Sequence, residues 1–262
     1  DGSASPCPLE GQTVLRLPAR HTTTGSSSKL ALCPARECPM SPPLPGGLPP
    51  TFHVRLVERT SLSRSVCRLL FERTDDAPFE FEAGQWVNLV IPTPGAPEPS
   101  VRRAYSVASP PLHTPRFELA VTRVENGPGS THLHQMSPGD ELKVVGPQGF
   151  FTRPLDKAGP SLFVGTGTGL TPLRSMLLHA VRAESKAPIW LLFGVREEAD
   201  ILFREELERV ASTHAETTRV MFSLSRAHDE WTGRRGWVQT HVKELWASLR
   251  DATGHDPHVY VC

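Results

Sequence analysis

Residues 161–172 read Ser161-Leu-Phe-Val-Gly165-Thr-Gly167-Thr-Gly169-Leu-Thr171-Pro172. A short apolar run ends in three glycines, and a proline followed by an apolar helical pattern comes next. This order predicts a strand, a tight turn and the N-terminus of a helix. Such a turn exposes backbone N–H groups beside the positive end of the helix dipole, a geometry that favours phosphate. Glycine turns also occur without a ligand, so this stretch alone indicates only the local fold.

The chain downstream of residue 161 alternates short apolar runs with amphipathic segments. This alternation predicts a parallel sheet wound in βαβ units. We expect its strands at 162–164, 189–193, 219–224 and 258–261. We expect helices between them at 171–184, 203–213 and 238–250.

The preceding region has a different texture, in which short β-like runs recur between turn signals. The runs are 52–57, 66–71, 86–91, 103–108, 117–124 and 141–145. Six short strands predict a small antiparallel barrel. One short helix is expected at 131–135, capped by Ser130. The chain is therefore expected to hold a six-stranded antiparallel β-barrel over 51–153 and a nucleotide-binding α/β domain over 158–262.

Residues 1–50 are rich in Pro, Ser, Thr and Gly and show no sustained periodicity. Such a segment buries too little apolar surface to offset the entropy lost on ordering, so we expect a disordered tail. The chain begins with Asp1 rather than Met, which leaves open an organelle-targeting signal that has been removed.

The totals exclude several classes of partner. Lys plus Arg and Asp plus Glu both count 28, so no net charge attracts nucleic acid or an anionic membrane. No apolar run approaches the roughly eighteen residues of a membrane span. The five cysteines are scattered and odd in number, which argues against a disulfide framework and favours a reducing compartment such as the cytoplasm.

Two patterns that resemble metal sites fail on spacing. Cys33 and Cys38 have the first gap of a plant-type iron–sulfur pattern, but Ser41 stands where the next ligand would fall. His132 and His134 are two residues apart rather than four, so a surface or helix-end role fits them better than a helical metal pair. The sequence therefore predicts no metal site.

A second motif, Arg103-Ala-Tyr105-Ser106, lies about sixty residues upstream of the glycine cluster. On a strand, Arg103 and Tyr105 point to one face, and Ala104 and Ser106 point to the other. The planar guanidinium suits a pyrophosphate, while the tyrosine ring suits a flat ligand and the serine hydroxyl a ring nitrogen. An exposed Arg beside a half-buried Tyr on an ordinary strand is the competing interpretation.

Taken together, the motifs resemble the ferredoxin–NADP reductase superfamily, in the form that joins an FAD barrel to a nicotinamide domain. The resemblance covers residues 51–262. The motifs that carry it are, in order, Ala83-Gly84-Gln85-Trp86-Val87, Arg103-x-Tyr105-Ser106, Gly127-x-x-Ser130, Gly146-Pro147-x-Gly149-x-Phe151, Gly165-x-Gly167-x-Gly169-x-x-Pro172, Phe193-Gly194-Val-Arg196 and Ser223-Leu-Ser225-Arg226.

The resemblance implies an FAD site in the barrel. Arg103 is expected to bind the pyrophosphate, Tyr105 to pack against the isoalloxazine, and Ser106 to donate a hydrogen bond near flavin N5. The short helix is expected to bring its N-terminus to the FAD phosphates. The residues expected there are Gly127, Gly129 and Ser130.

The resemblance also implies a nicotinamide-nucleotide site, with Thr166 near the stacked rings. The candidate cofactor-binding residues are Gly165, Thr166, Gly167, Thr168, Gly169, Pro172, Arg196, Ser225 and Arg226. Of all these residues, Tyr105, Ser106 and Thr166 are the candidate catalytic ones. Ser225-Arg226 grips a 2′-phosphate or forms a plain strand-end turn, and the Arg slightly favours NADPH over NADH. Arg234-Arg235 fits a solvated turn better, with a phosphate contact left open.

The implied reaction is hydride transfer from NAD(P)H to flavin N5, with electrons passed to a separate acceptor such as ferredoxin, a haem protein or an oxygenase component. Family members typically continue past the position of Cys262 with Cys-Gly-x-x-x-Met, so the nicotinamide domain is expected to be truncated. This leaves two alternatives open. One is a flavin-binding module without turnover that acts through partner assembly, and the other is an α/β nucleotide-binding protein without flavin.

Overall fold

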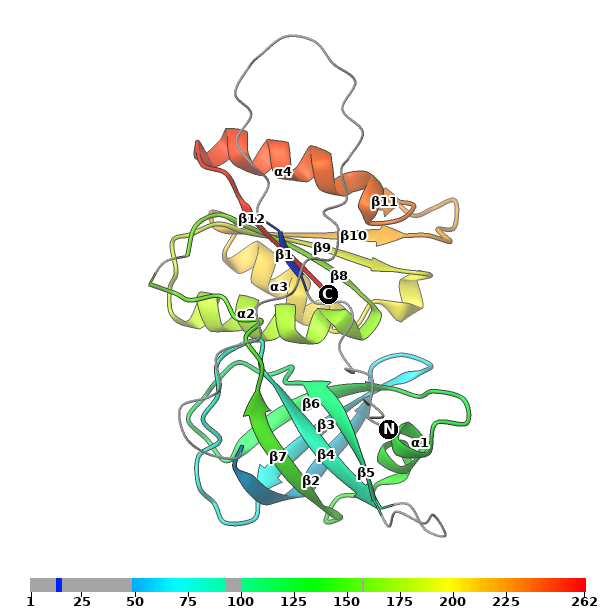
Figure 1. Ribbon diagram of the computed structural model, residues 1–262. Coiled ribbons are helices and arrows are strands. Elements are labelled where there is room, and N and C mark those ends of the chain that lie inside the picture. The colour runs from blue at the N-terminus through cyan, green and yellow to red at the C-terminus, as the bar shows by residue number, and fades with distance from the viewer. Residues whose placement is uncertain (1–12, 16–48, 93–99, 157) are drawn as a thin grey trace, which may run out of the picture.

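The structure is a computed structural model that describes residues 13–15, 49–92, 100–156 and 158–262. A barrel and an α/β unit are stacked on one another (Figure 1). Most of the expected tail, with Cys7, Cys33 and Cys38, lies outside the described residues.

The barrel is built from six antiparallel strands and one helix. They are β2 (Thr51–Ser61), β3 (Val66–Arg73), β4 (Trp86–Pro92), β5 (Ser100–Ser106), β6 (Arg116–Thr122), α1 (Pro128–Gln135) and β7 (Glu141–Gln148). The strands are ordered β5-β4-β7-β2-β3-β6, and an antiparallel bridge between Val107 and Leu119 joins the two ends. The predicted six-stranded barrel is confirmed.

Alternation of buried and exposed side chains holds the barrel together. Along β2, Phe52, Val54 and Leu56 are buried, while the alternate residues Thr51, His53 and Arg55 are exposed. Two further rings, Phe79 and Phe117, meet at 4.6 Å between centroids in the same core. A closed sheet with one apolar face satisfies its own backbone and leaves few free edges.

The predicted helix forms, but the predicted cap is wrong. The helix α1 begins at Pro128 after Gly127 as N-cap, and no side chain caps it. Ser130 already lies within the helix, where its Oγ accepts a hydrogen bond from the Val124 N–H at 3.0 Å. Proline is favoured in the first helical turn because it lacks an N–H to satisfy, so the helix starts earlier than expected.

The second unit alternates strands and helices as predicted. Its elements are β8 (Ser161–Thr166), η1 (Gly167–Gly169), α2 (Leu170–Arg182), β9 (Ile189–Val195), η2 (Glu198–Asp200), α3 (Arg204–Thr213), β10 (Thr218–Leu224), β11 (Arg234–Arg235), α4 (Gln239–Thr253) and β12 (His258–Val261). The strands β12, β8, β9, β10 and β11 are parallel neighbours, which confirms the parallel sheet.

One strand of this sheet comes from the region expected to be disordered. Residues Thr13–Leu15 form β1, which pairs antiparallel with β12. For these three residues the expectation of disorder is wrong. An edge strand has free backbone donors and acceptors, and a short β-prone segment added to β12 satisfies them.

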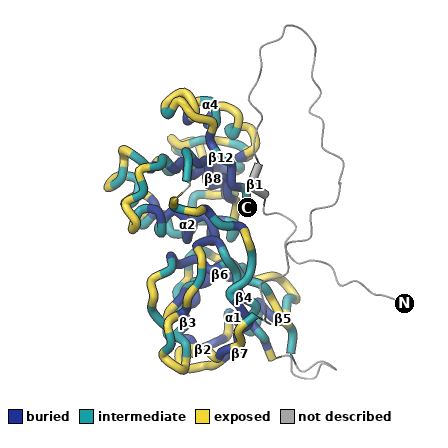
Figure 2. The backbone as a smooth tube through the Cα atoms, turned by 60° about the vertical axis from the view of Figure 1, so that its left-hand side comes forward, coloured by how far each residue is buried: buried dark blue, intermediate teal, exposed yellow. Residues whose placement is uncertain are grey.

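The two faces of the sheet pack against different partners. Figure 1 shows α4 on one face, while α2 lies between the other face and the barrel. The face under α4 is closed by a core that includes Leu162, Leu192 and Leu249. The opposite core contains Phe163 and continues into the barrel through Val66. Figure 2 shows buried segments both in the sheet and in the barrel.

None of the helices that the structure describes combines the length and the apolar character that a membrane crossing requires.

Candidate functional site

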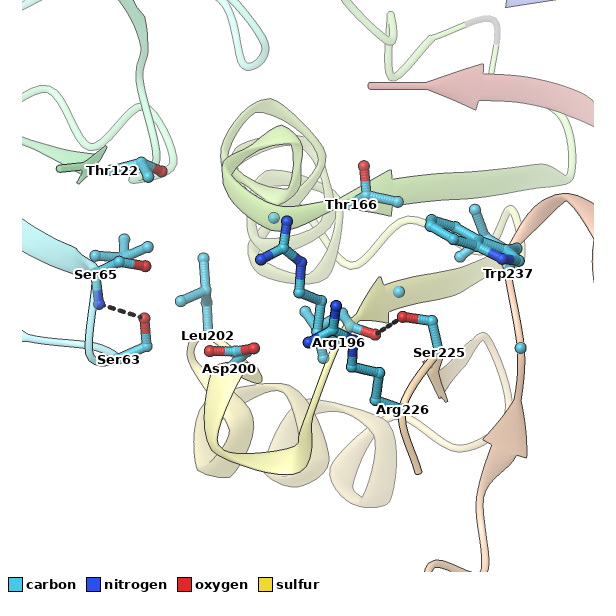
Figure 3. A pocket seen from close by; sticks show the side chains of 16 residues that line it. Ser63, Ser65, Thr122, Thr166, Arg196, Asp200, Leu202, Ser225, Arg226 and Trp237 are labelled. Carbon is cyan, nitrogen blue, oxygen red and sulfur yellow. Dashed lines mark hydrogen bonds between the residues drawn. The ribbon is translucent and has the colours of Figure 1, made fainter. Parts of the chain in front are cut away.

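A pocket of about 590 Å³ opens between the two units (Figure 3). It lies at the carboxyl ends of the parallel strands, where open α/β sheets bind their ligands. Its volume is within the range of roughly 300–1,000 Å³ that is usual for small-molecule sites. The barrel contributes Ser63, Ser65, Val66 and Thr122. The α/β unit contributes Thr166, Gly167, Gly194, Val195, Arg196, Asp200, Leu202, Ser225, Arg226, Gly236, Trp237 and Val238.

Gly167 of the glycine cluster lines this pocket, and the three glycines of the cluster have different surroundings. Gly167 has φ +52°, and a Cβ placed on it would meet nothing within 4 Å, so its backbone is open to a ligand. A Cβ on Gly169 would lie 2.4 Å from the carbonyl of Cys262, and one on Gly165 would lie 2.9 Å from Leu173. Only Gly167 therefore leaves room for a ligand, while the other two allow close packing.

The remaining residues of the turn link it to its neighbours. Thr166 is exposed at the end of β8, and its N–H donates to the Cys262 carbonyl at 3.1 Å. The hydroxyl of Thr168 lies 3.4 Å from that of Thr122, so the turn touches the barrel. Pro172 stands in the first turn of α2, where a missing N–H leaves no bond broken.

Two arginines lie at the strand ends on the far side of the pocket. Backbone bonds from Ser225 to Val195 and from Arg226 to Arg196, at 3.0 and 2.8 Å, hold the ends of β9 and β10 together. Both arginine side chains are exposed, and within the described residues neither forms an ion pair. A cationic rim of this kind suits a phosphate.

The neighbouring pair Arg234-Arg235 is not the solvated turn that the sequence predicted. These residues form β11 beside β10, and both guanidiniums are engaged. Arg234 donates two hydrogen bonds of 3.0 Å to Glu244, which holds the pKa of that carboxyl below its usual range. Arg235 donates to the carbonyls of His228, Asp229 and Trp231, each at 2.9 Å. The pair therefore fixes the segment next to the pocket.

Sequence reasoning missed the aromatic side chain at the pocket. Trp237 follows β11 and is 69% exposed, although exposed tryptophan is unusual. An indole face beside cationic groups offers a stacking surface for a planar base. The signal available in the sequence was its place two residues after Arg235, with only Gly236 between them.

The second predicted motif lies on β5 and meets the first turn of α1. Arg103 is exposed, and its Nη1 donates to the Arg102 carbonyl at 2.9 Å. A Cβ on Gly129 would lie 3.2 Å from the Arg103 Cγ, so the arginine side chain packs closely against the start of the helix. The structure thus brings together Arg103, Gly127, Gly129 and Ser130, beside a helix end with no side-chain cap. This arrangement fits a pyrophosphate.

Tyr105 and Ser106 complete β5 and lie outside the pocket lining. The Tyr105 ring is half-buried against the barrel core, and burial raises the pKa of its phenol to about 12. The ring is neutral at physiological pH and offers an aromatic face to a flat ligand. Ser106 pairs with Trp86 at the end of the strand.

The two histidines of α1 occupy the helix-end positions predicted for them. His134 Nε2 lies 2.9 Å from the Val121 carbonyl, which ties the helix to β6. Within the residues that the structure describes, no group of three His, Cys, Asp or Glu side chains is arranged to hold a metal ion.

Comparison with known proteins accords with these two sites. The family model for the oxidoreductase FAD-binding domain matches residues 53–152, and that for the oxidoreductase NAD-binding domain matches residues 163–262. Fold and site thus define a flavin-dependent NAD(P)H reductase that uses FAD with NADPH or NADH. The chain belongs to the ferredoxin–NADP reductase superfamily.

Several relatives support this assignment. The chain is 53% identical to ferredoxin–NADP reductase B of Sorangium cellulosum, over 80% of this chain and 85% of that protein. It is 29% identical to the phenol hydroxylase P5 protein of Acinetobacter pittii, over 83% of this chain and 59% of that one. The structure of the Amycolatopsis cytochrome P450 reductase GcoB matches with a TM-score of 0.65 and 27% identity, over 78% of this chain and 64% of that one. Such relatives accord with electron transfer to a separate partner.

Proposed function

We propose that this chain oxidises NADPH and delivers the electrons to a ferredoxin-type protein. The observation that carries the proposal is the pocket between the units, where an open glycine turn and two arginines face the barrel. The relative at 53% identity, which is named for both ferredoxin and NADP, supports the choice of both partners.

FAD, when bound, would supply the redox chemistry between the nicotinamide nucleotide and the acceptor. In our proposal Arg103 binds the FAD pyrophosphate together with the N-terminal turn of α1, which includes Gly127, Gly129 and Ser130. Tyr105 presents its neutral ring to the isoalloxazine. Ser106 donates a hydrogen bond near flavin N5.

The nicotinamide nucleotide is assigned to the pocket. Gly167 lets the pyrophosphate approach the backbone, with Thr166 and Thr168 beside it. Gly165, Gly169 and Pro172 keep the turn and the helix start in place. Arg226, with Ser225 and Arg196, binds the 2′-phosphate, which is the reason for preferring NADPH.

The NADPH preference is tested by Arg226→Ala. Loss of a charged hydrogen bond of about 1.5–3 kcal/mol raises the KM for NADPH roughly 10- to 100-fold. The KM for NADH stays within about twofold, because NADH has no 2′-phosphate. Arg219→Ala is the matched control. Arg219 is exposed, as Arg226 is, but it lies on β10 and stacks over Trp190 outside the pocket. An equal loss with both nucleotides would refute the assignment.

An oxygenase component is the second candidate acceptor, because the phenol hydroxylase P5 protein and the P450 reductase GcoB are also similar. The two acceptors are separated by adding each to the reduced protein and following cytochrome c or hydroxylated product. Cytochrome c reduction that requires added ferredoxin supports our proposal. Electron transfer only to an oxygenase component would replace ferredoxin with the second candidate.

A further inference from the structure

An arginine buried between the two units carries an inference beyond the cofactor sites. Arg174 lies on α2, and its side chain is only 6% exposed. Its Nη1 donates to the Ala108 carbonyl at 2.7 Å and to Glu118 of β6 at 2.8 Å. Its Nε and Nη2 donate to Glu206 of α3 at 2.6 and 2.9 Å. The guanidinium also lies 4.0 Å from the centre of the Phe203 ring.

The next residue on α2 makes a parallel connection. Ser175 is fully buried, and its hydroxyl donates to the Ser109 carbonyl at 2.7 Å. Ala108 and Ser109 are themselves fixed to Glu118, through the Ala108 N–H at 2.8 Å and the Ser109 Oγ at 3.1 Å. Two consecutive carbonyls of the barrel are thus held by two consecutive residues of one helix.

The position of this connection matters because of what lies on either side. Ala108 stands two residues after Ser106, on the segment that closes the barrel, and so lies next to the motif assigned to FAD. The helix α2 begins directly after the glycine turn assigned to the nucleotide. The network is therefore a short path between the two cofactor sites.

The chemistry of the network suits a geometric role. A buried arginine needs partners for its charge, and here two carboxylates and a carbonyl surround the planar fork. Glu118 also pairs with Arg68 at 2.9 Å, so two arginines face two glutamates. Replacing a buried ion pair with apolar groups is often neutral for stability, so stability alone gives little reason for this network.

We propose that Arg174 is a positioning residue, which sets the orientation of the α/β unit on the barrel and with it the alignment of nicotinamide and flavin. The inference rests on the proposed function of the two sites. Each cofactor binds mainly to its own unit, but hydride transfer needs the nicotinamide and flavin rings to be aligned with each other. A misplacement of about 1 Å can slow such a step about 100-fold.

The test uses the FAD-loaded protein with Arg174→Leu, Arg174→Lys and the control Arg182→Leu, an exposed arginine at the end of the same helix. Arg174→Leu is expected to keep its FAD and its affinity for NADP⁺ within about threefold. Anaerobic flavin reduction by NADPH is expected to slow roughly 10- to 100-fold at saturating nucleotide. Arg174→Lys, which keeps the charge but not the fork, is expected to be intermediate, and Arg182→Leu unchanged.

Two further readouts do not depend on turnover. The change in the flavin absorbance spectrum on adding NADP⁺ is expected to weaken in Arg174→Leu, and amide exchange over residues 107–119 is expected to rise. Ser175→Ala, which removes only the second connection, is expected to show both effects more weakly and covers the case in which Arg174→Leu does not fold.

An unchanged rate with an unchanged spectrum would overturn the positioning role. So would a rate loss that only mirrors lost FAD or NADP⁺ binding. If the unaltered protein is reduced by neither nucleotide, the proposed function fails instead, and the amide-exchange comparison of Arg174→Leu with Arg182→Leu still decides whether this arginine couples the two units.

Discussion

The barrel and the α/β unit bury their apolar side chains in different ways. The barrel encloses a single core, whereas the sheet of the α/β unit has two. The core under α4, here the private core, contains residues of the α/β unit alone. The core under α2, here the shared core, also includes Val66, Ala120 and Phe151 of the barrel. The pocket opens where the shared side meets the barrel. The shared core therefore holds the α/β unit against the barrel, while the private core stabilises only the sheet.

Adjacent leucines on β9 test this difference most strongly. Leu191 belongs to the shared core and Leu192 to the private core, and both are fully buried. Either substitution by Ala is expected to lower the free energy of unfolding by about 2–5 kcal/mol. Only Leu191→Ala is expected also to raise amide exchange in the barrel and to lower the temperature at which FAD is released. Equal barrel exchange in the two variants would mean that the units are not coupled through this core.

In the barrel, the proposed binding of FAD depends on an exposed arginine. Arg103→Ala is expected to weaken FAD binding roughly 10- to 100-fold, because a pyrophosphate loses a charged partner worth about 1.5–3 kcal/mol. Arg102→Ala, the adjacent exposed arginine on β5, is the control and is expected to retain FAD. Flavin content after gel filtration measures both. Undiminished FAD in Arg103→Ala would remove the residue from the site.

In the α/β unit, the proposed binding of the nucleotide depends on a glycine whose backbone is accessible to a ligand. Gly167→Val places a branched side chain at φ +52°, which costs about 1–3 kcal/mol of backbone strain, and fills the space above the turn. The protein is expected to stay yellow while its KM for NADPH rises at least tenfold. Gly254→Val carries similar strain at φ +71° at the end of α4, away from the pocket. If both variants lose NADPH turnover equally, strain rather than the site explains the effect.

Much of the fold could be predicted because its signals are local. The alternating burial along β2, the continuous apolar run of β9 and the helical period of α2 are set by neighbouring residues, so the elements lie within a few residues of their predicted bounds. The strands β1 and β11 were missed because they are very short and depend on pairing with β12 and β10. Such pairing is a property of the folded sheet.

The site was predictable to the extent that it follows motifs. Thr166, Gly167, Arg196, Ser225 and Arg226 were predicted from motifs, and the structure gathers them in one pocket. The barrel residues of the same pocket come from the loop between β2 and β3, from the first residue of β3 and from the end of β6, which carry no motif. Arg174 was also missed, because an arginine on an amphipathic helix is usually exposed. Its burial depends on the partner that the barrel supplies.

The smallest expected effect concerns a buried thiol in the barrel, which makes the stability of this unit depend on pH. Cys67 lies in the barrel core, where burial raises the pKa of its thiol from 9.0 to about 11. The folded state therefore binds more protons than the unfolded state between those values, so the free energy of unfolding falls as pH rises from about 9 to 11. Cys67→Val keeps an apolar side chain and removes the ionisation. Its urea-unfolding stability is expected to decline less steeply over this window than that of the unaltered protein.

Burial raises the pKa of Tyr105 in the same direction, but that residue is present in both proteins, so the difference in slope reports the thiol. Identical slopes would show that the thiol does not ionise on unfolding in this range.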